Sequence, residues 1–199
     1  MHVTKVLIAA GMMVYQSGLM LACEKYNSYS NEEAKEYLEM LNNPDANPVD
    51  RMFAIQQLAC SDNPNLRNHS VKEGLKQSAD PLVRNQVMLV AMMQKQRIDV
   101  ELSSQKELTK GDKKFIADNS GTYSNNVKYR SESEGCISLY SPKECLKQNS
   151  LFIKGDKLEF NHGAIMGEFR LSEGNELVGY IRVKNTSQYS RIPAVIKLF

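Results

Sequence analysis

Cysteine offers the widest range of chemistry in this chain of 199 residues. A thiol can ligate a metal, exchange with a disulfide, form a structural bridge or carry a lipid. The four cysteines are Cys23, Cys60, Cys136 and Cys145. No two of them have the close two-residue spacing of zinc ligands or redox sites, and the three histidines do not cluster near them. The spacing therefore predicts structural cysteines and no metal site.

Cys136 and Cys145 are the two cysteines best placed to form a disulfide. The residues between them include Ser141, Pro142 and Lys143, which are typical of a turn. In an oxidising compartment a bridge between them would close a small loop and stabilise it. We therefore expect a Cys136–Cys145 disulfide.

The first 22 residues have the composition of an export leader. Residues 1–5 carry one positive charge, and residues 6–22 follow without any charged side chain. A cationic start, an apolar stretch and a small residue at its end are typical of a secretory signal. An uncleaved anchor and a buried core helix are the alternatives for an apolar run of this length. We expect an exported protein in the periplasm or at a membrane surface.

Residues 19–23, Leu-Met-Leu-Ala-Cys, resemble the lipobox of bacterial lipoproteins. The resemblance implies a lipid on Cys23 that would hold the protein on a membrane. An ordinary cleaved signal without a lipid is the alternative. Cys60 is expected to be a buried thiol in the first case and the disulfide partner of Cys23 in the second.

Three further side chains are candidates for ligand binding. His162 lies between Asn161 and Gly163, at the tip of a predicted hairpin. Tyr123 and Tyr180 would line a pocket if the predicted strands close into a barrel. A solvated turn for the histidine and core packing for the tyrosines are the structural alternatives.

Several functional classes are disfavoured by the sequence. It contains neither a Gly-x-Ser-x-Gly nucleophile elbow nor a glycine loop that could cradle phosphates. Its 25 basic residues nearly balance its 23 acidic ones, without the concentrated basic face that nucleic acid requires. We therefore expect a non-enzymatic protein with no cofactor and no nucleic-acid partner.

Residues 23–97 have the apolar periodicity of helices. Ser30 and Glu33 have the spacing of a capping box, in which each side chain satisfies a first-turn amide of the other residue. Pro48 and Pro81 stand where proline opens a helix. The sequence predicts a helical domain over this range.

A repeat is visible inside the helical range. Residues 47–51, Asn-Pro-Val-Asp-Arg, align with residues 80–84, Asp-Pro-Leu-Val-Arg, at an offset of 33 residues. This pattern resembles the HEAT family of stacked antiparallel helix pairs. The resemblance implies a protein-interaction surface and a structural role for Arg51 and Arg84.

The C-terminal part has a different period. Residues 98–119 are polar and are predicted to be a connector. In residues 120–199 the apolar period is two, and turns such as Lys154-Gly155-Asp156 separate the short runs. Residues 120–123, Ser-Gly-Thr-Tyr, and 167–171, Gly-Glu-Phe-Arg-Leu, resemble small periplasmic β-domains of bacteria. The fold predicted for the chain is therefore α+β, with HEAT-like helix pairs followed by an antiparallel β-meander in the form of a small barrel or sandwich.

These features favour a binding or scaffold protein of the cell envelope, whose helical repeats contact a protein partner. The alternative is a carrier of a small hydrophobic ligand or lipid, with the β-domain as its cup. Exposed apolar side chains on the helices would favour the first function. An enclosed apolar cavity in the β-domain would favour the second.

Overall fold

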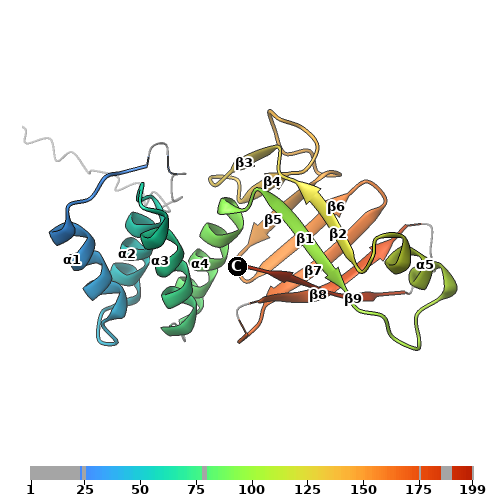
Figure 1. Ribbon diagram of the computed structural model, residues 1–199, viewed down its shortest axis with the longest axis horizontal. Helices are drawn as coiled ribbons and strands as arrows, with labels where there is room; N and C mark the ends of the chain where they lie inside the picture. Colours follow the sequence, from blue (N-terminus) through green and yellow to red (C-terminus); the bar gives the residue numbers. More distant parts are fainter. Residues whose placement is uncertain (1–22, 24–25, 78–79, 175, 185–189, 199) are drawn as a thin grey trace, which may run out of the picture.

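A computed structural model describes Cys23 and residues 26–77, 80–174, 176–184 and 190–198. Helices form the N-terminal part, and a curled antiparallel sheet forms the C-terminal part (Figure 1). The predicted α+β class is confirmed. The predicted leader, residues 1–22, lies outside the described residues.

Four helices make up the N-terminal part: α1 (Asn31–Asn42), α2 (Pro48–Ala59), α3 (Pro64–Gln77) and α4 (Pro81–Gln94). The predicted capping box opens α1, because the Ser30 hydroxyl accepts from the Glu33 amide at 3.2 Å and the Glu33 carboxylate accepts from the Ser30 amide at 2.9 Å. Asn47 caps α2 in front of Pro48, and its side chain accepts from the Asp50 amide at 3.0 Å. The predicted starts of these helices are confirmed.

The helices pack as two neighbouring pairs, α1 with α2 and α3 with α4. The pairs stack with α1 against α3 and α2 against α4 (Figure 1). The aligned segments at residues 47–51 and 80–84 therefore open the equivalent second helix of each pair. Fully buried side chains such as Ile55, Leu75 and Met88 fill the space between the pairs.

Residues 98–119, the predicted connector, contain a strand and a helix. Strand β1 (Arg97–Leu102) follows α4 almost directly, and helix α5 (Lys110–Asp118) follows later. In β1 the apolar Ile98, Val100 and Leu102 are buried and alternate with charged side chains. This alternation is that of a strand with one buried face, and β1 lies inside the sheet between two neighbours.

Eight more strands complete the sheet: β2 (Thr122–Asn126), β3 (Tyr129–Ser131), β4 (Cys136–Ser138), β5 (Ser150–Lys154), β6 (Lys157–His162), β7 (Ile165–Leu171), β8 (Glu176–Val183) and β9 (Ile192–Lys197). Their order is β2-β1-β9-β8-β7-β6-β5-β4-β3, and every pair is antiparallel. The last strand, β9, therefore lies between β1 and β8.

The two edge strands, β2 and β3, are consecutive segments of the chain. The Val127 amide still donates toward the β1 side, to the carbonyl of Gln96 at 2.9 Å. The next amide, that of Lys128, donates toward the β4 side, to the carbonyl of Ser138 at 2.9 Å. The chain thus changes partner within one residue, and it joins the two edges of the half-barrel directly.

Two phenylalanine–glycine pairs organise the inside of the curled sheet. Phe160 on β6 lies opposite Gly167 on β7, and Phe169 on β7 lies opposite Gly179 on β8. The two rings are fully buried and meet edge-to-face, with centroids 6.5 Å apart. Each phenylalanine thus lies opposite a strand position that has no side chain.

The helical and β parts share one buried cluster of apolar side chains. Arg84 of α4 also donates to the carbonyl of Ser172, after β7, at 2.9 Å. This contact agrees with the structural role expected for Arg84. Within the described residues, no helix combines the length and the apolar character needed to cross a membrane.

Candidate functional site

The structure brings two of the three candidate ligand-binding residues together. Tyr123 of β2 and His162 of β6 lie on the inner side of the sheet, with the Tyr123 hydroxyl 2.7 Å from Nδ1 of His162. Burial lowers the pKa of His162, so the imidazole is neutral near pH 7, and the tautomer of the ring decides whether Nδ1 donates or accepts in this bond. Burial also raises the pKa of Tyr123, so the hydroxyl stays protonated near pH 7.

Tyr180, the third candidate, lies on the opposite face of the sheet. On β8 it alternates with the fully buried Leu177 and Ile181, so its ring points outward. There it contacts two cations, with the guanidinium carbons of Arg182 and Arg191 at 5.4 and 4.5 Å from its ring centroid. The three residues do not form one site.

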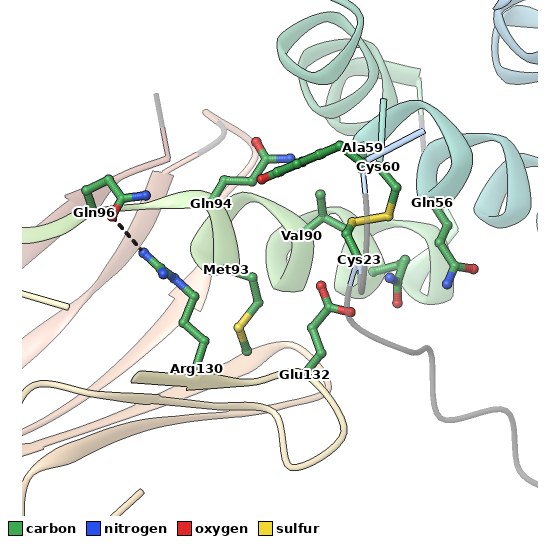
Figure 2. A pocket seen from close by; sticks show the side chains of 12 residues that line it. Cys23, Gln56, Ala59, Cys60, Val90, Met93, Gln94, Gln96, Arg130 and Glu132 are labelled. Carbon is green, nitrogen blue, oxygen red and sulfur yellow. Dashed lines mark hydrogen bonds between the residues drawn. A yellow bond between two sulfur atoms is a disulfide. The ribbon is translucent and has the colours of Figure 1, made fainter. Parts of the chain in front are cut away.

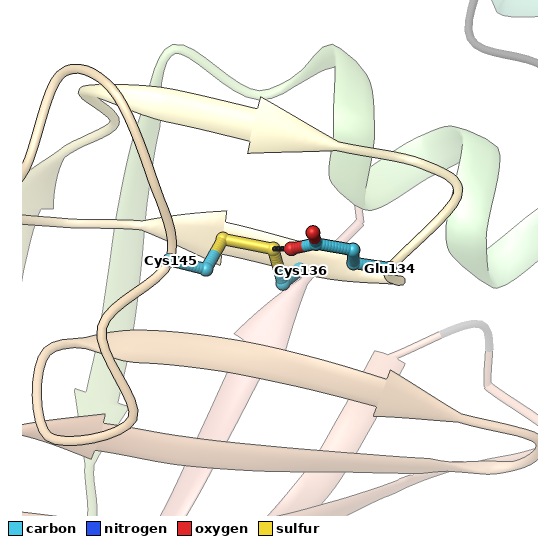
Figure 3. Close-up of side chains that lie close together, drawn as sticks. All are labelled: Glu134, Cys136 and Cys145. Atoms are coloured by element: carbon cyan, nitrogen blue, oxygen red, sulfur yellow. Dashed lines mark hydrogen bonds between the residues drawn. A yellow bond between two sulfur atoms is a disulfide. The ribbon is translucent and has the colours of Figure 1, made fainter.

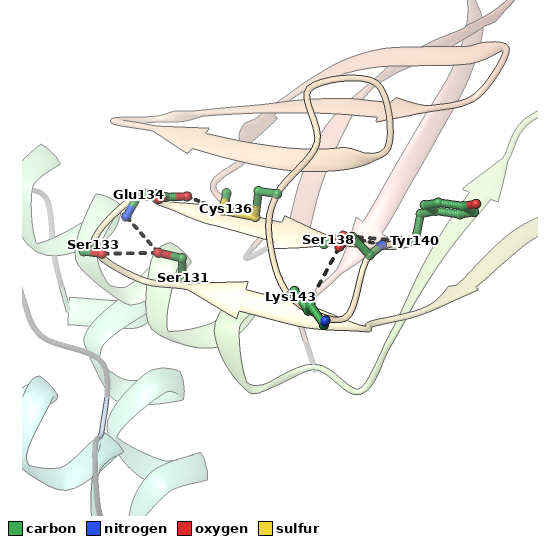
Figure 4. Close-up of a disulfide and its surroundings, with 9 residues drawn as sticks. Ser131, Ser133, Glu134, Cys136, Ser138, Tyr140 and Lys143 are labelled. Carbon is green, nitrogen blue, oxygen red and sulfur yellow. Dashed lines mark hydrogen bonds between the residues drawn. A yellow bond between two sulfur atoms is a disulfide. The ribbon is translucent and has the colours of Figure 1, made fainter.

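The Cys136–Cys145 disulfide is present, as the sequence predicts. It ties β4 to the loop that follows, and the Glu134 carboxylate lies 3.4 Å from Sγ of Cys136 (Figure 3). These three side chains have the proximity of metal ligands, but two sulfurs bonded to each other cannot act as thiolate ligands. Ser138 shapes the same loop, because its hydroxyl accepts from the Tyr140 amide at 3.4 Å (Figure 4) and from the Ser141 amide at 3.0 Å. The cluster is therefore structural.

Cys23 is bonded to Cys60, which is the second of the two alternatives for these cysteines. The bridge joins the start of the described chain to the C-terminal end of α2. A sulfur in a disulfide cannot also carry the thioether of a lipid anchor, so this covalent state excludes lipidation of Cys23 in the same molecule. The two disulfides are compatible with an oxidising compartment outside the cytoplasm.

A cavity of about 180 Å³ lies between the helices and β3. The Cys23–Cys60 disulfide forms part of its helical wall, and Arg130 and Glu132 rise into it from the sheet (Figure 2). Gln86 and Met93 of α4 also line it. The cavity thus combines side chains that are far apart in the sequence.

The two charged groups of this cavity do not form an ion pair with each other. Arg130 instead donates through Nη2 to the carbonyl of Lys95 at 2.5 Å and to the side chain of Gln96 at 3.3 Å. Burial without a counter-charge raises the pKa of Glu132 to about 7. Burial likewise lowers the pKa of Arg130.

A second candidate site is an exposed cluster on the outer side of α1 and α2. We call it the aromatic patch, and it consists of Tyr29, Tyr37, Val49 and Phe53. Tyr37 meets Tyr29 and Phe53 edge-to-face, with ring centroids 5.3 and 5.9 Å apart. Val49 lies one turn before Phe53 on α2, so the two side chains share a face.

The aromatic patch is tied to α2 by a hydrogen bond and has acidic neighbours on α1. The Tyr29 hydroxyl donates to the Gln57 side chain of α2 at 2.9 Å, which fixes the segment before α1 against that helix. Burial raises the pKa of Tyr37, and the negative charges of Glu33 and Glu36 raise it further. The patch therefore combines an apolar centre with a negative border.

Comparison with protein-family models, with curated proteins and with solved structures gave no match for this chain. The resemblances to lipoproteins, to HEAT repeats and to small periplasmic β-domains stay predictions. The cavity and the aromatic patch are therefore the features from which a function can be inferred.

Sequence reasoning missed both sites for different reasons. The cavity depends on contacts between α4 and β3, although Arg130 and Glu132 are two residues apart, a spacing that places both on one side of a strand. The aromatic patch had a local signal, because Val49 and Phe53 are four residues apart on a predicted helix.

Proposed function

We propose that this chain is an exported, non-enzymatic binding protein of the cell envelope, and that its helical part docks a protein partner on the aromatic patch. The supporting observation is the exposure of large apolar side chains on the helices. Val49 is 67% exposed and Phe53 is 46% exposed, beside the two ordered tyrosines. Aromatic side chains of this kind are enriched at the centres of protein interfaces.

The negative border indicates the chemistry of the partner. Glu33 and Glu36 lie on α1 next to Tyr37, and Glu32 adds negative charge to the same helix, whereas Glu39 pairs with Lys35. A partner surface with basic side chains around an apolar centre would complement this arrangement. Its association should therefore be faster at low ionic strength than at high ionic strength.

Replacing Phe53 by serine should weaken binding of that partner at least tenfold, because interface aromatics commonly contribute more than ~1.4 kcal/mol. The partner is first identified by photocrosslinking from position 53 in the full chain, and its affinity is then measured by titration. Val178→Ser is the matched control, since Val178 is 47% exposed but lies on β8. Equal loss of affinity in both variants, or no loss in either, would contradict the proposal.

The covalent state of Cys23 is tested separately by the intact mass of the protein purified from its native source. We expect the mass of a chain cleaved near Cys23, reduced only by the hydrogens lost on forming two disulfides. A mass increased by an acyl-glyceryl group, with Cys60 open to alkylation, would instead establish a lipoprotein. An uncleaved leader would contradict export by processing.

A further inference from the structure

Three polar groups of the cavity between α4 and β3 lack a hydrogen-bond partner among the described residues. The Gln86 side chain is only 9% exposed, lines the cavity and takes part in no hydrogen bond of the described chain. Nε of Arg130 is buried and has no partner there. The Glu132 carboxyl also lines the cavity without a hydrogen bond or an ion pair to a described residue. Buried polar groups are normally satisfied, so the unpaired Nε of Arg130, beside two further polar side chains without a partner, needs a physical reason.

The geometry keeps the opposite charges apart within one cavity. Arg130 and Glu132 lie two residues apart at the end of β3 and face the same space (Figure 2). The carbonyl of Lys95 and the side chain of Gln96 hold the far end of the guanidinium, so it cannot turn fully toward Glu132. An unused donor and an unused acceptor therefore remain in place for a third molecule.

We propose that the cavity binds a small zwitterion of the α-amino-acid type. Its carboxylate would accept from the guanidinium of Arg130, its ammonium would donate to Glu132, and the Gln86 amide would complete its hydrogen bonds. This site is separate from the aromatic patch, and the proposal does not depend on the docking function.

The rest of the lining and the size of the cavity limit the ligand further. Ala59, Val90 and Met93 form an apolar wall suited to a short aliphatic side chain. The volume of about 180 Å³ is below the range of roughly 300–1,000 Å³ that is usual for sites of drug-sized ligands. L-valine is therefore a suitable probe.

The protonation state of Glu132 makes the affinity for the ligand depend on pH. Because burial raises its pKa to about 7, Glu132 is mostly protonated below that pH and cannot pair with an ammonium group. Affinity for L-valine should therefore rise between about pH 5.5 and about pH 8, by up to tenfold for each pH unit below the pKa. The bound ammonium should lower the pKa of Glu132.

The test is calorimetric titration of the oxidised full chain with L-valine, alongside two analogues that each lack one charge. Isobutylamine lacks the carboxylate and isovalerate lacks the ammonium, and each should bind at least tenfold more weakly than L-valine. Glu132→Gln should also cost at least tenfold in affinity. Glu134→Gln is the matched control and should bind as the parent does, because Glu134 is exposed and does not line the cavity.

Two outcomes would overturn the proposal. One is the absence of binding up to about 10 mM L-valine near pH 8, seen as no heat in calorimetry and no chemical-shift change in NMR spectra of the protein. This concentration corresponds to a very weak affinity. The other is equal binding of L-valine and its single-charge analogues. The analogue comparison needs no variant, so it decides the question even if Glu132→Gln folds poorly.

Discussion

Replacing Phe169 by alanine should lower the free energy of unfolding by about 4 kcal/mol, within the range of roughly 3–5 kcal/mol for buried phenylalanines. The ring is fully buried, lies opposite Gly179 and packs against the ring of Phe160. Its removal leaves a cavity that Gly179 cannot fill, because that residue has no side chain. Urea unfolding of the two proteins measures the difference, with the slope of the transition expected to stay the same.

Phe53→Ala provides the comparison for this core substitution. Phe53 is 46% exposed on the aromatic patch, so its loss should change the free energy of unfolding by about 0.5 kcal/mol or less. If Phe169→Ala proved as mild as Phe53→Ala, the inside of the sheet could not be packed as described. The pair of variants thus separates a residue that maintains the fold from one proposed to bind a partner.

Gly179→Ala should also destabilise the protein, by about 3 kcal/mol, although it adds only one methyl group. The new Cβ would lie 2.0 Å from the carbonyl oxygen of Glu168 and 2.8 Å from Cα of Phe169. These are backbone atoms of the neighbouring strand, so no side-chain rotation relieves the contact, and β7 and β8 must separate locally. Thermal and urea unfolding measure the loss.

Gly174→Ala is the matched control for this glycine. Its new Cβ would be 3.6 Å from the Ser172 hydroxyl, an ordinary contact distance, so stability should be unchanged or slightly raised. Equal stability of the Gly179→Ala and Gly174→Ala proteins would argue against the close approach of β7 and β8 at this position.

Local chemistry made much of the fold predictable. The capping box at Ser30 and Glu33 and the proline at Pro48 act within a single turn of helix, so their geometry follows from sequence spacing alone. The period of two after residue 120 likewise predicts strands with one buried face. These signals identify elements, but they do not state which strands become neighbours.

Strand β1 was missed because it is short and half of its residues are charged, which makes it look like part of a polar connector. Three of its six residues are charged, and the strand follows α4 with only two residues between them. The alternation of Ile98, Val100 and Leu102 was nevertheless visible. What the sequence could not supply was the neighbour β9, almost a hundred residues later, with which Glu101 and Leu102 of β1 pair.

For the candidate site residues too, positions that depend on neighbours in the sequence were predictable, whereas contacts between distant segments were not. The alternation along β8 already separates Tyr180 from the buried Leu177 and Ile181, so its outward position was predictable. The contact between Tyr123 and His162 was not, because it depends on how far the sheet curls. The pairing of Cys23 with Cys60 was left open for a similar reason, since it requires the chain before α1 to return to the end of α2.

The position of β9 between β1 and β8 determines the order in which the helices and the sheet can fold. The four helices and β1 are complete by residue 102, but β9 begins only at Ile192. As the chain emerges from its N-terminus, the helices can therefore assemble early, while β1 has to wait for the final strand to enter between it and β8. Until then the facing backbone groups of both strands are unpaired and open to other chains. Completion of this sheet thus requires the six-residue strand β9, which lies far along the chain from β1.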